Sequence, residues 1–95
     1  MQVVIRKYAG KGSKELFDLL EQNAAEITKR MGAVNGLVSY TLARTSDGGF
    51  SVTVCQDKAG IDQGAQIARD WISQNAASIG AAAPEIVAGN VIANA

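Results

Sequence analysis

The chain has 95 residues, so it is expected to form a single domain, residues 1–95, and a domain of this size buries only somewhat more than roughly 60% of its unfolded surface. Nine basic residues balance nine acidic ones, which leaves no positive excess of the kind that draws proteins to nucleic acid or membrane surfaces. Histidine is absent, which excludes Ser-His-Asp and Cys-His nucleophiles, histidine-ligated haem and, with one cysteine, the common zinc sites, so no metal or cofactor is expected.

The first half of the chain predicts a strand and then a helix. Residues Gln2–Tyr8 read as a strand, and three consecutive apolar residues, Val3 to Ile5, indicate burial on both of its faces. A helix is predicted over Lys14–Met31 from apolar residues recurring at three or four positions. Ser13 is its expected N-cap and Gly32 its expected left-handed end.

The loop between these two elements carries the sequence's single phosphate-like signal. The segment AGKGSK, Ala9–Lys14, puts two glycines, two lysines and a serine at a strand-to-helix junction. Backbone N–H groups at such a junction attract anions. The spacing differs from that of a phosphate-binding loop, so a plain turn with a helix cap is favoured.

A hairpin is predicted over Asn35–Asp57, and its register has two readings. A two-residue loop would place Tyr40 and Leu42 on the same face as Ser51, Thr53 and Cys55, mixing apolar and small polar side chains. A three-residue loop, with Gly49 left-handed, instead gathers the larger apolar side chains on one face. We predict this second register, with the following residues facing the helices: Val38, Tyr40, Leu42, Phe50, Val52 and Val54.

A second helix and a fourth strand complete the pattern. Asp57 is the expected N-cap of the helix, and Gly80 its expected end. Its buried stripe is predicted to contain Ile61, Ala65, Ala68, Trp71, Ile72, Ala76 and Ile79. The segment Glu85–Asn94 reads as the last strand. The order βαββαβ predicts an α+β fold, a ferredoxin-like plait with two helices on one face of a four-stranded antiparallel sheet.

One face of this sheet has no helix to cover it. The first strand is apolar on both faces, and the fourth distributes Ile86, Val87, Val91 and Ile92 over both. A contiguous apolar patch of this kind usually marks an interface. We therefore expect a homodimer that buries the open sheet face of one copy against that of another.

The chain also resembles a known family over nearly its whole length. Matching features are Gly36 at the start of the second strand, the Asp57-Lys58-Ala59-Gly60 turn, Ala68 with Trp71, and the Pro84-Glu85-Ile86 opening of the last strand. With these it is similar to small stand-alone proteins of the dimeric α+β barrel superfamily, close to the antibiotic biosynthesis monooxygenase-like domains. The resemblance implies pairing through the sheets and a small-molecule cavity between each sheet and its own helices.

The resemblance implies different expectations for the two catalytic branches of that superfamily. Its haem-degrading members use an Asn-Trp-His set, and this chain has no histidine, so haem degradation is not expected. Its cofactor-free monooxygenases oxidise aromatic substrates in cavities that use Asn, Trp, Tyr and Arg groups. The resemblance makes Trp71 a candidate of that type but does not match the others residue by residue.

Three residues are candidates for ligand binding, and each has a plainer structural reading. Trp71 lies on the apolar stripe of the second helix, where a core anchor is the more common role. Tyr40 and Tyr8 would orient a phenolic ligand through their hydroxyls, although most such tyrosines pack their rings and bond locally. Cys55 has no basic neighbour and is read as a small buried side chain. A lone cysteine and the absence of a leader or membrane-spanning segment predict a cytoplasmic protein.

Three functions remain open from the sequence. The first is a dimeric domain that binds a hydrophobic or aromatic metabolite without chemistry. The second is a cofactor-free monooxygenase-like enzyme that uses the same cavity. The third is a purely structural or interaction protein. The first and third rank above the second because no acid, base or nucleophile constellation is visible.

Overall fold

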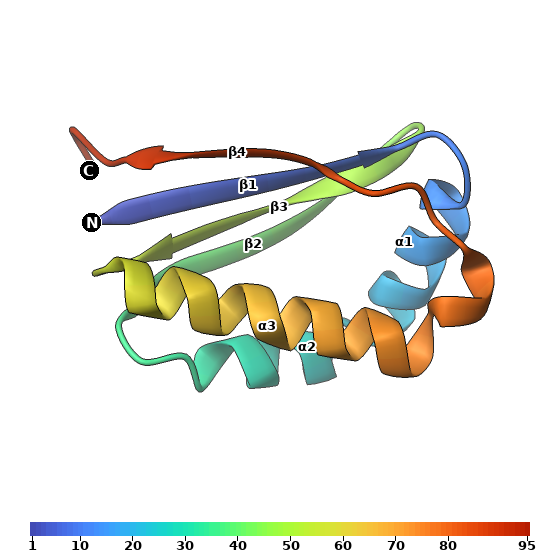
Figure 1. The fold of residues 1–95 in the computed structure, drawn as a ribbon, viewed down its shortest axis with the longest axis horizontal. Helices are drawn as coiled ribbons and strands as arrows, with labels where there is room; N and C mark the ends of the chain where they lie inside the picture. Colours follow the sequence, from blue (N-terminus) through green and yellow to red (C-terminus); the bar gives the residue numbers. More distant parts are fainter.

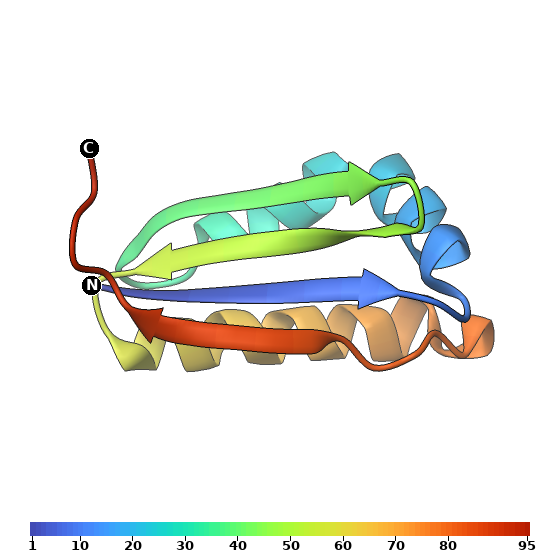
Figure 2. The ribbon, with the colours of Figure 1, turned by 90° about the horizontal axis from the view of Figure 1, so that it is seen from above.

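The computed structural model describes residues 1–95 as a four-stranded antiparallel sheet with helices packed on one face (Figure 1). The strands lie in the order β2 (Leu37–Thr45), β3 (Gly48–Cys55), β1 (Gln2–Ala9) and β4 (Glu85–Asn90). The helices are α1 (Ser13–Gln22), α2 (Ala24–Gly32) and α3 (Lys58–Asn75), followed by a 3₁₀ turn, η1 (Ala77–Ile79). Figure 2 shows all of them behind the sheet, with the other face bare. The predicted plait is confirmed, and none of its helices has the length and apolar character needed to cross a membrane.

The first helical segment differs from the prediction because it is broken in two at Asn23. The backbone there leaves the helical region, with φ −114° and ψ 20°. The Asn23 side chain donates a hydrogen bond to the carbonyl oxygen of Leu19 at 2.8 Å, the kind of local bond by which asparagine competes with a continuing helix. As a result α1 and α2 bury separate residues, Leu16, Phe17 and Leu20 from one and Ile27 and Met31 from the other.

Of the four predicted helix ends, one is confirmed. Gly80, at φ 63°, ends the 3₁₀ turn η1 rather than α3, which ends at Asn75. The N-cap of α1 is Gly12, at φ 75°, and Ser13 is instead a buried first residue whose hydroxyl has no partner. Gly32 has no positive φ, and α2 ends on Ala33 in a right-handed conformation. Asp57 caps α3 as predicted, because its carboxylate accepts a hydrogen bond from the Gly60 backbone N–H at 3.2 Å.

The predicted hairpin register is also wrong. Thr45 pairs with Gly48, Leu42 with Ser51 and Tyr40 with Thr53, so the loop has two residues, the arrangement that the prediction rejected. In the predicted register Leu42 would pair with Val54, so the observed pairing is shifted by three residues, and a shift by an odd number of residues exchanges the two faces of a strand. Ser51, Thr53 and Cys55 therefore face the helices and are buried, while Phe50, Val52 and Val54 face the open side.

Close helix packing explains why small residues line the inner face of β3. Gly60 and Gly64 of α3 lie so near the sheet that a Cβ atom on Gly60 would come within 3.1 Å of the Cys55 sulfur, and one on Gly64 within 3.8 Å of Thr53. Larger side chains on β3 would push the helix away. The glycines, which weaken a helix by propensity, are thus matched to the small side chains opposite them.

The open face of the sheet consequently carries the larger apolar side chains. Antiparallel pairing places residues of β3, β1 and β4 beside one another across this face, in rows such as Val52, Ile5 and Val87. All of its apolar members are partly or fully exposed: Val3, Ile5, Phe50, Val52, Val54 and Val87. The uncovered apolar sheet face that we expected is present. On β3, however, it carries Phe50, Val52 and Val54 instead of Ser51, Thr53 and Cys55, which the predicted register placed there.

The last strand is shorter than predicted and ends at Asn90 rather than Asn94. Every residue of β4 is exposed, although Figure 2 shows α3 running behind this strand, because a groove separates the two elements. The loop before it is held by a hydrogen bond from the Ala82 backbone N–H to the Lys11 carbonyl oxygen at 2.8 Å. This contact keeps the segment before Pro84 close to the turn that precedes α1.

Candidate functional site

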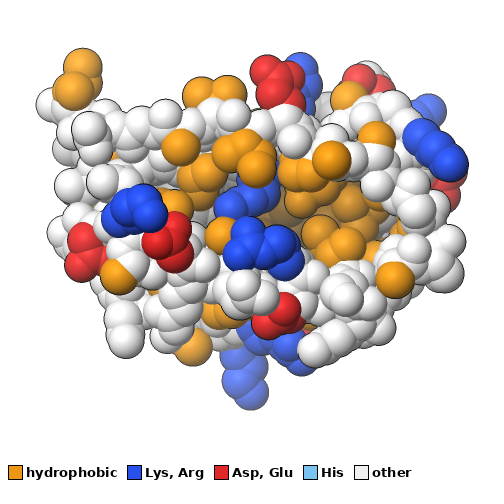
Figure 3. All heavy atoms as spheres, in the orientation of Figure 1, with side chains coloured by type: hydrophobic (Ala, Val, Ile, Leu, Met, Phe, Trp, Pro, Cys, Tyr) orange, Lys and Arg blue, Asp and Glu red, His pale blue; other side chains and the backbone are white.

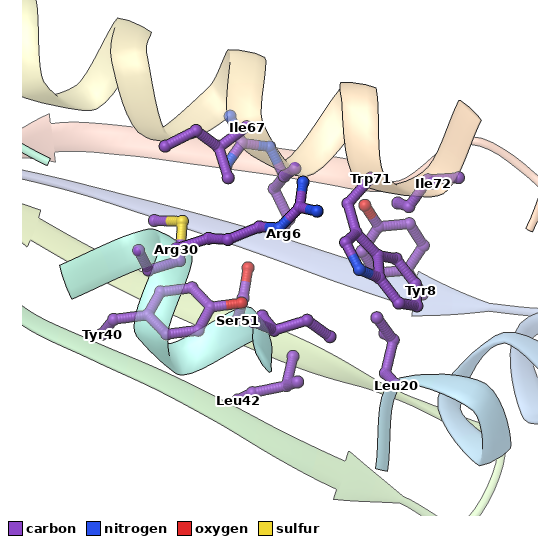
Figure 4. A pocket seen from close by; sticks show the side chains of 13 residues that line it. Arg6, Tyr8, Leu20, Arg30, Tyr40, Leu42, Ser51, Ile67, Trp71 and Ile72 are labelled. Atoms are coloured by element: carbon purple, nitrogen blue, oxygen red, sulfur yellow. The ribbon is translucent and has the colours of Figure 1, made fainter. Parts of the chain in front are cut away.

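A cavity lies between the inner face of the sheet and all three helices (Figure 4). Thirteen residues line it, ten of them hydrophobic. The helices contribute Leu20 from α1, Ile27, Arg30 and Met31 from α2, and Ile67, Ala68, Trp71 and Ile72 from α3. The sheet contributes Arg6, Tyr8, Tyr40, Leu42 and Ser51. The three predicted candidates, Trp71, Tyr40 and Tyr8, therefore line one cavity, although they come from three different elements.

Trp71 has an unused hydrogen-bond donor at this cavity. Its side chain is only 3% exposed, and its indole Nε1–H has no hydrogen-bond partner in the protein. In Figure 4 the indole nitrogen lies on the edge of the ring that is turned toward the cavity. A buried donor without a partner costs about 1–3 kcal/mol, so this N–H is a group that a bound acceptor would satisfy.

Tyr8 and Tyr40 supply the phenols of the cavity. Tyr8 is 9% exposed and packs its ring against Phe17, with centroids 5.8 Å apart. Burial raises the pKa of Tyr8, and the positive charge of Arg6 partly opposes that rise. Burial also raises the pKa of Tyr40, with a further contribution from Tyr8 and an opposing one from Arg6. Both phenols are therefore protonated at neutral pH and available as hydrogen-bond donors.

Arg6 and Arg30 both bring a positive charge to the lining of this cavity, and Arg30 is paired with Glu26 at 3.0 Å. Arg6 lies on β1 opposite Ser51 and Ile86, on the face covered by the helices, and is partly buried. The salt bridges of the protein involve Arg30, Arg44 and Lys58, but not Arg6. Arg6 thus has no carboxylate partner.

Arg44, by contrast, is fully engaged. Its guanidinium donates to Asp18 at 2.6 Å and lies 3.7 Å from Glu21, which ties β2 to α1. These carboxylates raise the pKa of Arg44, the hydrogen bond to Asp18 being the first cause. Of these two arginines, only Arg6 has a charge that the protein leaves uncompensated.

The cavity adjoins a wider groove between α3 and β4. Arg6, Tyr8, Ala68 and Ile72 line both spaces. The inner cavity has a volume of about 40 Å³, room for roughly three water molecules, whereas the groove has a volume of about 500 Å³. Figure 3 shows this hollow from outside, with hydrophobic side chains within it and basic groups beside it. Of these two spaces, only the groove has the size of a typical small-molecule site, roughly 300–1,000 Å³.

The site has donors but no group suited to general-base catalysis. No carboxylate lines either the inner cavity or the groove, and the chain has no histidine. No three Cys, Asp or Glu side chains come together as metal ligands would. Cys55 is fully buried, and burial, with the nearby charge of Asp57, raises the pKa of its thiol. The arrangement is therefore suited to holding an apolar molecule that carries hydrogen-bond acceptors.

Sequence reasoning missed Arg6 and Ser51. Arg6 follows an apolar run and precedes Lys7, so it reads as the solvated end of a strand. Ser51 was assigned to the wrong face by the register error. The Ala9–Lys14 loop forms a plain turn, as favoured, and a Cβ atom on Gly12 would meet the Ala81 backbone at 2.8 Å.

Comparison with known proteins gives structural matches but no sequence matches. No protein-family model and no curated protein matches the chain. A protein of unknown function from Nitrosomonas europaea is similar in structure, with a TM-score of 0.72, 21% identity, and 99% of this chain and 90% of that one covered. A dimeric ferredoxin-like protein from an uncultured marine organism has a TM-score of 0.62 and 14% identity, with 98% and 94% covered.

A third similar structure is a monooxygenase from Streptomyces coelicolor in complex with the ligand nanaomycin D. It has a TM-score of 0.59 and 17% identity, and the match covers 98% of this chain and 92% of that one. At these identities the likeness establishes the fold and leaves the activity open. The chain therefore has a ferredoxin-like α+β fold, which it shares with these proteins.

Proposed function

We propose that this protein binds a small hydrophobic or aromatic molecule between its sheet and its helices. The observation that carries the proposal is the unpartnered indole N–H of Trp71 in a cavity that adjoins a groove of about 500 Å³. A hydrogen-bond acceptor on a bound molecule would satisfy this donor. A monooxygenase of similar fold has been crystallised in complex with nanaomycin D, which supports a small organic ligand for a protein of this fold.

The proposal includes a homodimer formed through the open sheet face. The partly exposed row of Ile5, Val52 and Val87 is the central support for it, because apolar patches of this kind mark interfaces. The similar marine protein is described as dimeric. The groove lies on the helix side of the sheet, so pairing through the open face leaves the groove accessible.

The second candidate is a cofactor-free monooxygenase-like enzyme that acts on an aromatic substrate in the same site. The similar monooxygenase and the uncompensated charge of Arg6 favour it, because a positive charge stabilises the phenolate form of a substrate. Haem degradation is not part of the proposal, since the chain has no histidine to ligate iron.

Two measurements test these proposals. Ligand binding is tested by titrating the protein with N-phenyl-1-naphthylamine, a neutral aromatic probe whose fluorescence rises in apolar surroundings, and by repeating the titration with Ala68→Phe, which fills the junction of cavity and groove. Binding that this variant abolishes supports the proposal, and binding that it leaves unchanged refutes it. Oxygen uptake with hydroquinone substrates, present in the wild type and lost in Ala68→Phe, separates the enzyme from the binder.

A further inference from the structure

The polar groups of the site are unusually one-sided, because nearly all of them are donors. Arg6 carries up to five N–H donors and no acceptor, and the Trp71 indole carries one donor and no acceptor. Tyr8, Tyr40 and Ser51 add hydroxyls that both donate and accept. Arg69 and Ser73 line the outer groove. Since no aspartate or glutamate lines either space, a ligand rich in acceptors and negatively charged is favoured over a neutral or cationic one.

The position of Arg6 also indicates how such a ligand would lie. Arg6 lines both spaces and therefore stands at their junction, with the Trp71 N–H on the inner side of that junction. The inner volume of about 40 Å³ holds a carboxylate or a group of similar size but not an aromatic ring. The outer groove of about 500 Å³ has room for the ring system.

We infer that the ligand is an aromatic or otherwise apolar organic anion, whose acidic group pairs with Arg6 at the inner cavity and whose apolar body lies in the groove between α3 and β4. This inference rests on the proposed binding function and specifies its ligand class. Trp71 would donate its free N–H to the same acidic group or to an oxygen next to it. The charge of Arg6 would then be compensated only in the complex.

A pair of probes with the same aromatic body tests the inference. 8-Anilinonaphthalene-1-sulfonate carries a sulfonate, and N-phenyl-1-naphthylamine has the same rings without it. Dissociation constants for both are measured by fluorescence titration for the wild type, Arg6→Gln, Arg6→Lys and Arg69→Gln. Arg69 is exposed at the edge of the groove, so its replacement removes the same charge without removing the buried pairing and serves as the matched control.

We expect Arg6→Gln to weaken binding of the sulfonate about tenfold or more, as the loss of a partly buried charge-assisted hydrogen bond does, and to change binding of the neutral probe less than about twofold. Arg6→Lys should restore part of the affinity, and Arg69→Gln should have a much smaller effect because its charge is solvated. Raising the salt concentration should weaken binding of the sulfonate probe and leave binding of the neutral probe unchanged.

Two other results would overturn the inference, and they are distinguishable. In the first, Arg6→Gln weakens binding of both probes equally, or of neither probe, while Ala68→Phe abolishes binding of both. The proposed site then exists but does not select anions. If Ala68→Phe leaves the binding of both probes unchanged, the probes bind elsewhere, and the proposed function fails together with the inference.

Discussion

Replacing Trp71 by phenylalanine separates the two roles of this residue, because it keeps an aromatic ring in the core and removes the unpartnered N–H. The smaller ring leaves roughly 40 Å³ of additional space, which at about 24 cal/mol per Å³ costs roughly 1 kcal/mol. Removing a buried donor without a partner returns about 1–3 kcal/mol. The free energy of unfolding of Trp71→Phe should therefore be unchanged or raised by up to about 2 kcal/mol, and each 1 kcal/mol raises the melting temperature of a domain of this size by roughly 4–8 °C.

Urea denaturation followed by circular dichroism measures this difference at one fixed protein concentration, because the stability of the proposed dimer would depend on concentration. Trp71→Ala is the matched variant, since it removes the ring as well, and it should cost about 3–5 kcal/mol. In the same preparations, Trp71→Phe should bind 8-anilinonaphthalene-1-sulfonate more weakly than the wild type does. A loss of about 3 kcal/mol or more in Trp71→Phe would refute the reasoning, because it would mean that the indole N–H stabilises the free protein.

Three further predictions concern the assembly, the phenols and the hairpin. Val52→Asp puts a charge at the centre of the open sheet face and should convert the proposed dimer into a monomer in sedimentation experiments. The control, Ser78→Asp on the exposed turn η1, should leave the dimer intact. A wild-type protein that sediments as a stable monomer would contradict the proposed interface. Because burial raises the pKa of Tyr8 and of Tyr40, the free energy of unfolding should be highest below pH about 10 and fall as pH rises through the folded-state values. The ultraviolet absorbance of phenolate should then appear at higher pH in the folded than in the unfolded protein. In Arg6→Gln it should appear at still higher pH, because the charge of Arg6 lowers the pKa of Tyr8 and of Tyr40. If the folded and unfolded proteins titrate at the same pH, the two phenols are not buried as described. A Cβ atom at Gly49 would overlap the Phe17 ring and the Ala43 carbonyl, so Gly49→Ala should lower the free energy of unfolding by about 1–3 kcal/mol. A Cβ atom at Gly89 has no other atom within 4 Å, so Gly89→Ala should leave the free energy of unfolding nearly unchanged in the same denaturation assay.

The candidate site could be predicted only in part. Trp71 was found because its helical spacing identifies a buried position, and aromatic residues in strands made Tyr40 and Tyr8 candidates. Arg6 was missed because nothing in a run of alternating residues says which side of a doubly apolar strand is covered by helices. The charge that decides the proposed ligand class became visible only when β1 was placed between β3 and β4.

The break at Asn23 shows the same limit for helices. The apolar spacing across it is continuous, so periodicity predicts one helix, and it gives no weight to a single side chain that bonds the carbonyl four residues earlier. The cap at Asp57 was predicted correctly because a capping bond depends on the three residues that follow it. Local signals were reliable where the interaction itself was local.

The sequence by itself determined the order of the elements, the plait, the excess of apolar strand residues that leaves one sheet face uncovered, and, through the absence of histidine, the chemistry that the protein lacks. Only the tertiary structure decided which row of β3 faces the helices. Alternation with a period of two defines two faces but is indifferent to which of them is inside. In this protein, Gly60 and Gly64 of α3 approach Cys55 and Thr53 of β3 so closely that only small side chains fit between them. This contact joins two separate elements, and no local sequence pattern gives the distance between them.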